Sequence, residues 1–90
     1  MRKLSDYNFC NSWVLREVNI TPNEDYLVLM DVGELKQGER VRFVGFDDVD
    51  NHYGIFVFVD AQDRVLEVSG DCAGENHSCV RDMKRALSTP

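Results

Sequence analysis

The chain has 90 residues, of which 43% are hydrophobic and 29% are charged, a composition typical of one small folded domain spanning 1–90. Its formal net charge of −6 disfavours contact with nucleic-acid phosphates, so we expect no nucleic-acid partner. The longest apolar run, 55–59, is too short to cross a bilayer, and polar residues follow Met1-Arg2-Lys3 where a signal peptide has its apolar segment. We therefore expect no membrane partner and a cytoplasmic location.

The first predicted element is an N-terminal helix near 5–17. Ser5 or Asp6 is a suitable N-cap. Apolar residues follow at the spacing of one helix face: Phe9, Cys10, Trp13, Val14 and Val18. From Trp13 onward the alternation of a strand also fits, and the helix is the interpretation that we prefer.

The next segment combines a helix start with the composition of a strand. Thr21-Pro22-Asn23-Glu24 has the residues of a capping box with proline at the first helical position. The run 26–30 that follows is apolar on all sides, as in a strand buried on both faces. We predict a strand near 25–31 preceded by a proline turn.

Three further strands are predicted near 39–46, 54–60 and 64–69. In the first of them, Val41 and Phe43 alternate with arginines, and a bulge at Gly45 is needed to return Phe46 to the core. The strand near 54–60 is apolar on both faces, which predicts a central position in the sheet. Residues 60–63 form the short hairpin connection to the last strand.

A C-terminal helix is predicted near 78–87. Its apolar residues recur at the spacing of one helix face: Cys79, Val80, Met83, Ala86 and Leu87. Lys84 and Arg85 near its end favour the helix dipole.

Together these elements predict an α+β fold. The sheet is four-stranded and mostly antiparallel, or a small SH3-like partly closed barrel, with the C-terminal helix and the N-terminal helix covering a face. The predicted core consists of Trp13, Tyr26, Val28, Met30, Val41, Phe43, Ile55, Val57, Leu66, Val68, Val80, Met83 and Leu87. We also interpret Phe43, Phe46, Phe56 and Phe58 as core residues rather than a platform for stacking bases.

The cysteines and one histidine are the candidate metal ligands. Cys72, His77 and Cys79 follow the spacing C-x4-H-x-C, and Cys10 is the fourth possible ligand. The tight C-x2-C pair typical of structural zinc sites is missing. The same loop offers a thiol beside an imidazole, yet no motif makes it a catalytic set. We therefore predict no metal, no cofactor and no enzymatic activity.

The acidic segment 47–52 is the candidate binding loop. A calcium loop of the EF-hand type fails, because Tyr53 stands where glycine is required and Val59 where the bidentate glutamate belongs. A solvated hairpin loop is the simpler interpretation of this segment. A patch built from Tyr53, Phe56 or Phe58 that the helices leave uncovered would instead indicate a protein–protein surface. The predicted protein-binding residues are Asp47, Asp48, Asp50 and Tyr53.

Three segments carry a resemblance to a known family. They are Tyr26-x-Val28, Gly38-Glu39-x-Val41-x-Phe43-x-Gly45-Phe46 and Gly54-Ile55-x-x-Phe58. They resemble an uncharacterised family of short bacterial domains with Y-x-V, G-E-x-W-x-F-x-G-Y and G-L-x-x-F strands, although Val41 stands where that pattern has tryptophan. The resemblance implies a fold and a bacterial or phage origin, and no activity.

For the function we predict a non-enzymatic protein-binding module of bacterial origin with a protein partner, and the acidic net charge favours a basic one. One alternative is an acidic inhibitor, of the toxin-immunity or nucleic-acid-mimic type, which requires the acids of 31–75 to form one contiguous face. Another alternative is a small metal- or thiol-dependent protein that uses Cys10, Cys72, His77 and Cys79.

Overall fold

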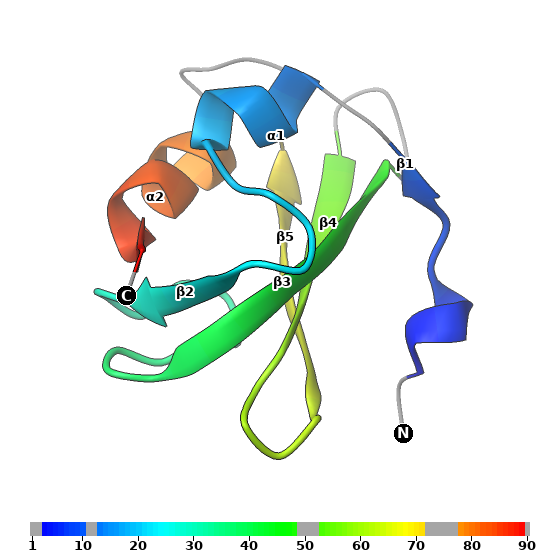
Figure 1. Ribbon diagram of the computed structural model, residues 1–90. Helices are drawn as coiled ribbons and strands as arrows, with labels where there is room; N and C mark the ends of the chain where they lie inside the picture. The colour runs from blue at the N-terminus through cyan, green and yellow to red at the C-terminus, as the bar shows by residue number, and fades with distance from the viewer. Residues whose placement is uncertain (1–2, 11–12, 49–52, 72–77, 90) are drawn as a thin grey trace.

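The computed structural model describes residues 3–10, 13–48, 53–71 and 78–89. In these ranges a strongly curled antiparallel sheet carries two short helices on one side (Figure 1). The elements are a 3-10 turn (Leu4–Asp6), β1 (Phe9–Cys10), α1 (Trp13–Val18), β2 (Asp25–Val28), β3 (Arg40–Asp48), β4 (Tyr53–Val59), β5 (Val65–Asp71), α2 (Ser78–Ala86) and β6 (Leu87–Ser88). Within this part of the chain no helix has the length and apolar character needed to cross a membrane.

In the described ranges the sheet has six strands rather than the predicted four, because the short β1 and β6 also pair with it. Their order is β5-β4-β3-β2-β6, and β1 joins by pairing with β3. The long strand β3 therefore has β4 along one edge, with β2 and then β1 along the other edge. All pairs are antiparallel, which confirms the α+β class and the antiparallel sheet. The strand predicted to be central, β4, is an interior strand, while β3 occupies the middle of the order.

No strand pairing in the described ranges joins β5 to β6, so the sheet is open rather than a closed barrel. The loop between β2 and β3 instead reaches the free edge of β5. Glu34 N donates a hydrogen bond to Glu67 O at 3.0 Å, and Glu67 N donates one to Glu34 Oε1 at 2.8 Å. Gly33 makes this approach possible, because a Cβ there would lie 2.8 Å from Glu67 O. The loop thereby covers part of an edge that would otherwise be open to pairing with another chain.

The predicted bulge in β3 is confirmed. The register between β3 and β4 shifts between Phe43 and Gly45, so that Phe43 and Phe46 both face the core. Phe43 is fully buried and Phe46 is 2% exposed. One extra residue in β3 therefore places two phenylalanines on the same side of the sheet, as the residue pattern required.

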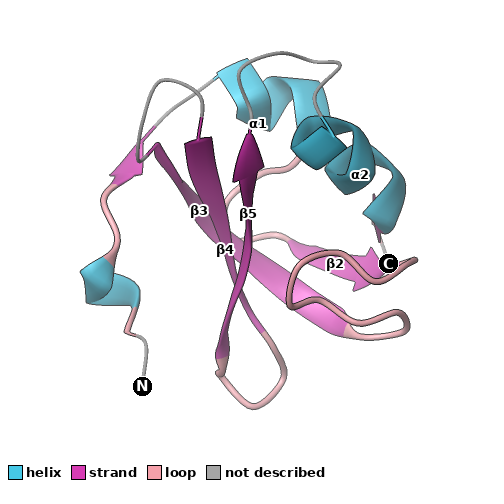
Figure 2. Ribbon diagram, turned by 180° about the vertical axis from the view of Figure 1, so that it is seen from behind, coloured by secondary structure: helices cyan, strands magenta, loops and turns pink. Residues whose placement is uncertain are grey.

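The core lies between the concave side of the sheet and the two helices (Figure 2). Phe43, Phe46, Phe56 and Phe58 are all buried and form tilted ring pairs with centroids 4.9–6.4 Å apart, which confirms their interpretation as core residues. The buried members of the core cluster are Leu15, Val18, Ile20, Tyr26, Val28, Leu35, Val41, Phe43, Phe46, Phe56, Phe58, Val68, Val80 and Met83.

Four of the predicted core positions differ from the prediction, at least in part, or lie outside the described residues. Phe56 and Phe58 take the core side of β4, so Ile55 and Val57 point to the opposite side, where Val57 is nevertheless fully buried as predicted. Met30 lies beyond the end of β2 and is 38% exposed. The side chain of Trp13 is outside the described part of the chain.

The helix predicted near 5–17 is wrong as one element. Phe9 and Cys10 pair as β1 with Asp47 and Phe46 of β3, and this long-range pairing replaces the helix over that segment. What remains helical is α1, from Trp13 to Val18.

The proline-turn interpretation before β2 is confirmed. Glu24 N donates to Thr21 O at 3.2 Å, with Pro22 and Asn23 (φ 71°) in the middle of the turn, the arrangement of a type II turn. The strand that follows is shorter than predicted and ends at Val28. It alternates between half-buried and buried residues, so it is not buried on both faces.

The predicted C-terminal helix is confirmed as α2, which ends one residue early because Leu87 pairs with Val28 as part of β6. Val80, Met83 and Ala86 are fully buried beneath α2. Lys84 Nζ forms an ion pair with Glu17 Oε1, which joins the outer sides of α2 and α1.

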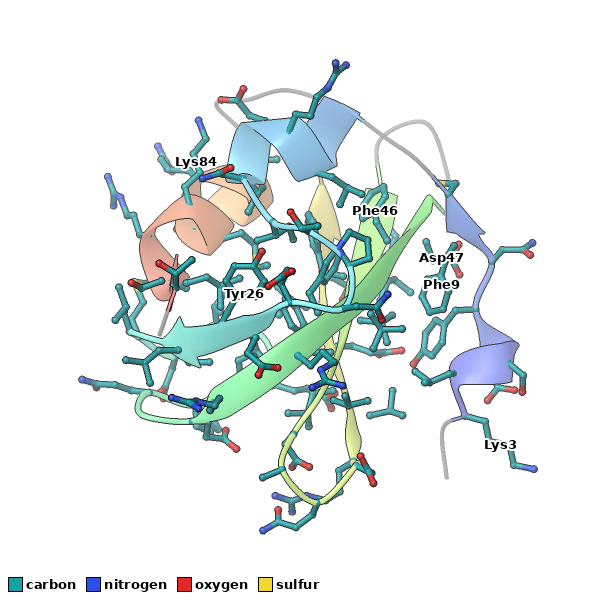
Figure 3. The ribbon with its side chains drawn as sticks, viewed as in Figure 1. Lys3, Phe9, Tyr26, Phe46, Asp47 and Lys84 are labelled. Carbon is teal, nitrogen blue, oxygen red and sulfur yellow. The ribbon has the colours of Figure 1, made fainter. Side chains whose placement is uncertain are left out.

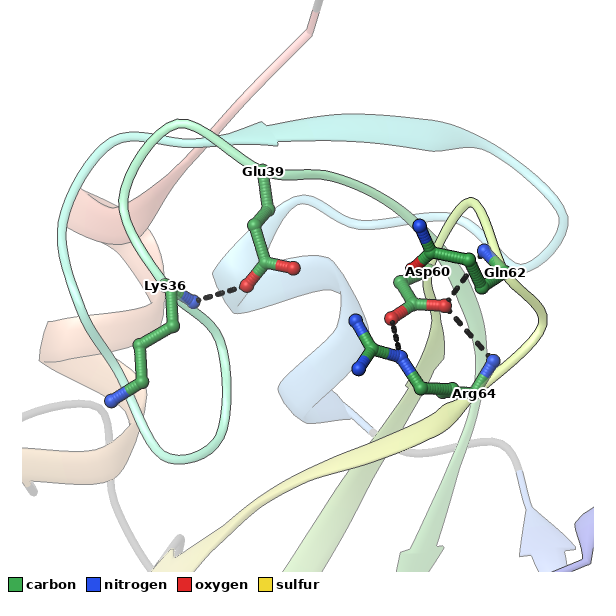
Figure 4. Close-up of polar contacts among 5 residues, drawn as sticks. All are labelled: Lys36, Glu39, Asp60, Gln62 and Arg64. Carbon is green, nitrogen blue, oxygen red and sulfur yellow. Dashed lines mark hydrogen bonds and ion pairs between the residues drawn. The ribbon is translucent and has the colours of Figure 1, made fainter.

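The β4–β5 turn is built around the carboxylate of Asp60, whose side chain is 3% exposed (Figure 4). Its Oδ1 accepts hydrogen bonds from Gln62 N and Arg64 N, both at 2.9 Å, and its Oδ2 accepts one from Arg64 Nε at 2.6 Å. Burial raises the pKa of the Asp60 carboxyl, but the hydrogen bonds from Arg64 and Gln62 outweigh it and hold this pKa below its usual value.

Because the pKa of Asp60 is lower in the folded than in the unfolded chain, its contribution to stability is present above the ordinary aspartate pKa of about 3.9 and is lost as the pH falls below it. We expect Asp60→Asn to lower Tm at pH 7, since it removes the charge that Arg64 faces. The difference in Tm between wild type and variant should shrink as the pH falls below about 4. Thermal unfolding over this pH range measures it, and a difference that stays constant would contradict the role of the ionised carboxylate.

Candidate functional site

The side of the sheet opposite the core, called the outer face here, holds the candidate site. Neighbouring strands place their residues in rows across it, because residues that are partners in register point to the same side. These rows are Asp47, Ile55 and Ser69; Gly45, Val57 and Glu67; and Arg42, Val59 and Val65. The middle of the outer face, on β4, is therefore aliphatic, with the carboxylate of Asp47 on β3 to one side and that of Glu67 on β5 to the other.

Residues 3–10, called the N-terminal arm here, run past this face on the side of the molecule away from α2, as Figures 1 and 2 both show. The rings of Tyr7 and Phe9 are stacked with centroids 5.8 Å apart. The hydroxyl of Tyr7 donates a hydrogen bond to Glu67 Oε2 at 2.5 Å. Asn8 N donates one to Asp47 Oδ2 at 3.2 Å, and Figure 3 shows Phe9 close to Asp47.

The ring of Phe9 lies directly on Gly45. A Cβ at Gly45 would lie only 2.6 Å from Phe9 Cδ1, so the ring occupies the space that any other residue would fill. Val57, in the same row as Gly45, is fully buried although it lies outside the core cluster. The arm therefore buries the aliphatic centre of the outer face.

The arm leaves apolar surface exposed around itself. Leu4, Phe9 and Tyr53 are 39%, 41% and 44% exposed, and Tyr53 precedes Ile55 on the outward side of β4. Apolar surface that is gathered on one face and bordered by polar groups is typical of a protein interaction site.

The structure places two of the predicted protein-binding residues on this face. Asp47 lies in the row of Ile55 and contacts the arm, and Tyr53 is exposed beside that row. Asp48 belongs to β3, but its side chain is not described, and Asp50 lies outside the described residues. The sequence analysis did not predict Phe9 as part of the site, because it assigned residues 5–17 to a helix. A glycine inside a strand often marks a close contact with its backbone, so Gly45 was the signal that could have indicated the contact with Phe9.

The alternative of a metal- or thiol-dependent protein depends mainly on residues outside the described part of the chain. Cys10 is exposed in β1, Cys72 and His77 fall outside the described ranges, and the side chain of Cys79 is not described. Among the described residues, no three side chains of the metal-binding types come together.

A hollow of about 600 Å³ lies beside the turn before β2. Its lining residues are Asn19, Thr21, Asn23, Glu24, Asp25, Tyr26, Arg40 and Thr89. Several of its polar groups already serve the fold, since Tyr26 Oη accepts a hydrogen bond from Thr21 N at 2.7 Å and Asp25 pairs with Arg42 at 3.2 Å. The hollow is open and polar, and it presents no set of groups arranged for catalysis.

Comparison with known proteins adds no assignment: no family model, no curated protein and no solved structure matches this chain. The resemblance over Tyr26 to Phe58 therefore stays a prediction, and the functional argument rests on the outer face.

Proposed function

We propose that this protein is a non-enzymatic protein-binding module that binds its partner through the outer face of its sheet. The observation that carries the proposal is the exposed aromatic and aliphatic surface around Phe9 and Tyr53, on the face that neither helix covers. With a net charge of −6 and with Asp47 and Glu67 on this face, the partner that fits it best is a basic protein.

The local roles of the acids also favour a binding module over an acidic inhibitor. Asp31 accepts a hydrogen bond from Gln37 N at 2.8 Å, and Glu39 accepts one from Lys36 N at 3.0 Å (Figure 4). Asp60 closes the β4–β5 turn in the same way. Acids with such roles stabilise separate turns rather than presenting one continuous charged face.

The test compares two aspartate substitutions at similarly exposed apolar residues in different parts of the sheet. Tyr53→Asp introduces a charge on the outer face, and Leu29→Asp introduces one at the end of β2, where Leu29 is 46% exposed against 44% for Tyr53. We expect a partner captured by the wild type from the source cell to be captured equally by Leu29→Asp. Its recovery with Tyr53→Asp should fall about tenfold or more, as for an aromatic residue central to an interface.

Far-ultraviolet circular dichroism and Tm measurements verify that both variants are folded. A partner whose capture is reduced equally by the two substitutions, or by Leu29→Asp alone, would contradict the assignment of the outer face.

A further inference from the structure

We infer that the outer face is a binding site for an extended, basic peptide segment with aromatic side chains two residues apart, and that Tyr7 to Cys10 of the arm occupy this site in the free protein. The inference rests on the proposed function and specifies the partner's chemistry. The contacts of the arm indicate which backbone and side-chain groups of a peptide the outer face can bind.

The first feature of the site is a short length of strand edge that the arm covers. Phe43 of β3 is bonded to Asn23 and Glu24, and beyond it the described residues that pair with this edge are Phe9, with Asp47, and Cys10, with Phe46. An extended peptide pairs with such an edge through its backbone, whatever its sequence, and gains specificity from alternate side chains.

The second feature is the slot over Gly45, which sets the spacing of the aromatic side chains. Phe9 fills the slot, and Tyr7, two residues earlier, stacks on it with its hydroxyl on Glu67. Side chains two apart in an extended chain point to the same side. A partner that carries aromatic residues at this spacing reproduces both contacts.

The third feature is the charge of the site. Asp47 and Glu67 accept hydrogen bonds from Asn8 N and the Tyr7 hydroxyl, which are both uncharged donors. Lysine or arginine side chains offer the same carboxylates charge-assisted hydrogen bonds, which are stronger. A peptide that carries basic side chains beside its aromatic residues therefore complements the acidic groups of the outer face.

The arm itself is held weakly enough to be displaced. Its strand is two residues long, Phe9 stays 41% exposed, and in the arm only Tyr7 is half-buried while the rest are exposed. Its displacement leaves the core cluster intact, because none of its residues belongs to that cluster.

The experiment measures the affinity of the full chain for the synthetic peptide Arg-Lys-Tyr-Asn-Phe-Ser-Lys by isothermal titration calorimetry. In Tyr7→Ala/Phe9→Ala the competing arm contacts are lost, so we expect the peptide to bind about tenfold tighter than to wild type. The matched control Leu29→Ala/Met30→Ala removes two exposed apolar side chains elsewhere and should leave the affinity unchanged. Adding Gly45→Ala to the arm variant fills the slot and should reverse the gain.

Three results would overturn the inference: an arm variant that binds no tighter than wild type, a Gly45→Ala addition without effect, or equal binding of a peptide with serine in place of both aromatic residues. A wild-type dimer that Tyr7→Ala/Phe9→Ala cannot form would assign the site to the arm of a second copy instead. If the peptide does not bind while capture of a protein partner still depends on Tyr53, this inference is wrong and the proposed function stands.

Discussion

We expect the Leu35→Ala variant to have a free energy of unfolding about 2–5 kcal/mol below that of the wild type. Leu35 is fully buried, although it lies in the loop between β2 and β3, and it belongs to the core cluster. Reciprocal hydrogen bonds with Val32, of 2.8 and 3.0 Å, hold the backbone so that this side chain reaches inward. Truncation removes core contacts and also loosens the loop from β5.

Urea unfolding measures this loss of unfolding free energy in Leu35→Ala, and Lys36→Ala at the next position is the control. Lys36 is exposed and its ion pair with Asp31 spans 4.0 Å, so its truncation should change the free energy of unfolding by less than about 0.5 kcal/mol. Hydrogen exchange at the amide of Glu67, which donates to Glu34, should also quicken in Leu35→Ala. A Leu35→Ala variant as stable as Lys36→Ala would contradict the role of the loop in the core.

Gly54→Ala should lower the free energy of unfolding by about 1–3 kcal/mol through overpacking. A Cβ at Gly54 would lie 2.2 Å from Phe46 Cζ and 2.4 Å from Phe46 Cε1. Phe46 cannot simply turn away, because it is 2% exposed and its ring centroid lies 4.9 Å from that of Phe56. The added methyl group therefore forces a shift in the phenylalanine cluster.

A double-mutant cycle with Phe46→Leu isolates this clash. The smaller side chain leaves room for the methyl group, so the Gly54→Ala/Phe46→Leu variant should lose less free energy of unfolding than the sum of the two single variants. Chemical denaturation of the four proteins measures the coupling, and strictly additive losses would show that the two residues do not compete for space.

The parts of the fold that the sequence predicted well are those with strong local signals. The alternation in 39–46 together with Gly45 predicted both the strand and its bulge, and the helical spacing after residue 78 predicted α2. The N-terminal helix was wrong because β1 forms only when β3 is present to pair with it. Such a contact between distant segments leaves no periodic pattern in two residues.

The candidate site shows the same division. Asp47 and Tyr53 were predicted from an acidic loop beside an aromatic residue, and both lie on the outer face. Which side of β4 faces outward was not predictable from its pattern, because the strand is apolar at every position. Phe56 and Phe58 take the core side, and the smaller Ile55 and Val57 are left for the face that the arm crosses.

The two faces of the sheet therefore have separate roles. The inner face holds the core cluster that determines stability, and the outer face holds surface that can change without affecting that cluster. This separation makes the binding proposal testable, since outer-face substitutions such as Tyr53→Asp should weaken binding about tenfold or more in a protein that remains folded.

The most direct test of the binding face is a two-dimensional NMR titration of the ¹⁵N-labelled protein with the basic aromatic peptide. We expect the largest shift changes at the amides of Gly45, Asp47, Ile55 and Val57, with new signals for Tyr7 and Phe9 as the arm is displaced. Changes confined to Leu29, Met30 and α2 would contradict the account, because the bound segment would then lie away from the strands that the arm contacts.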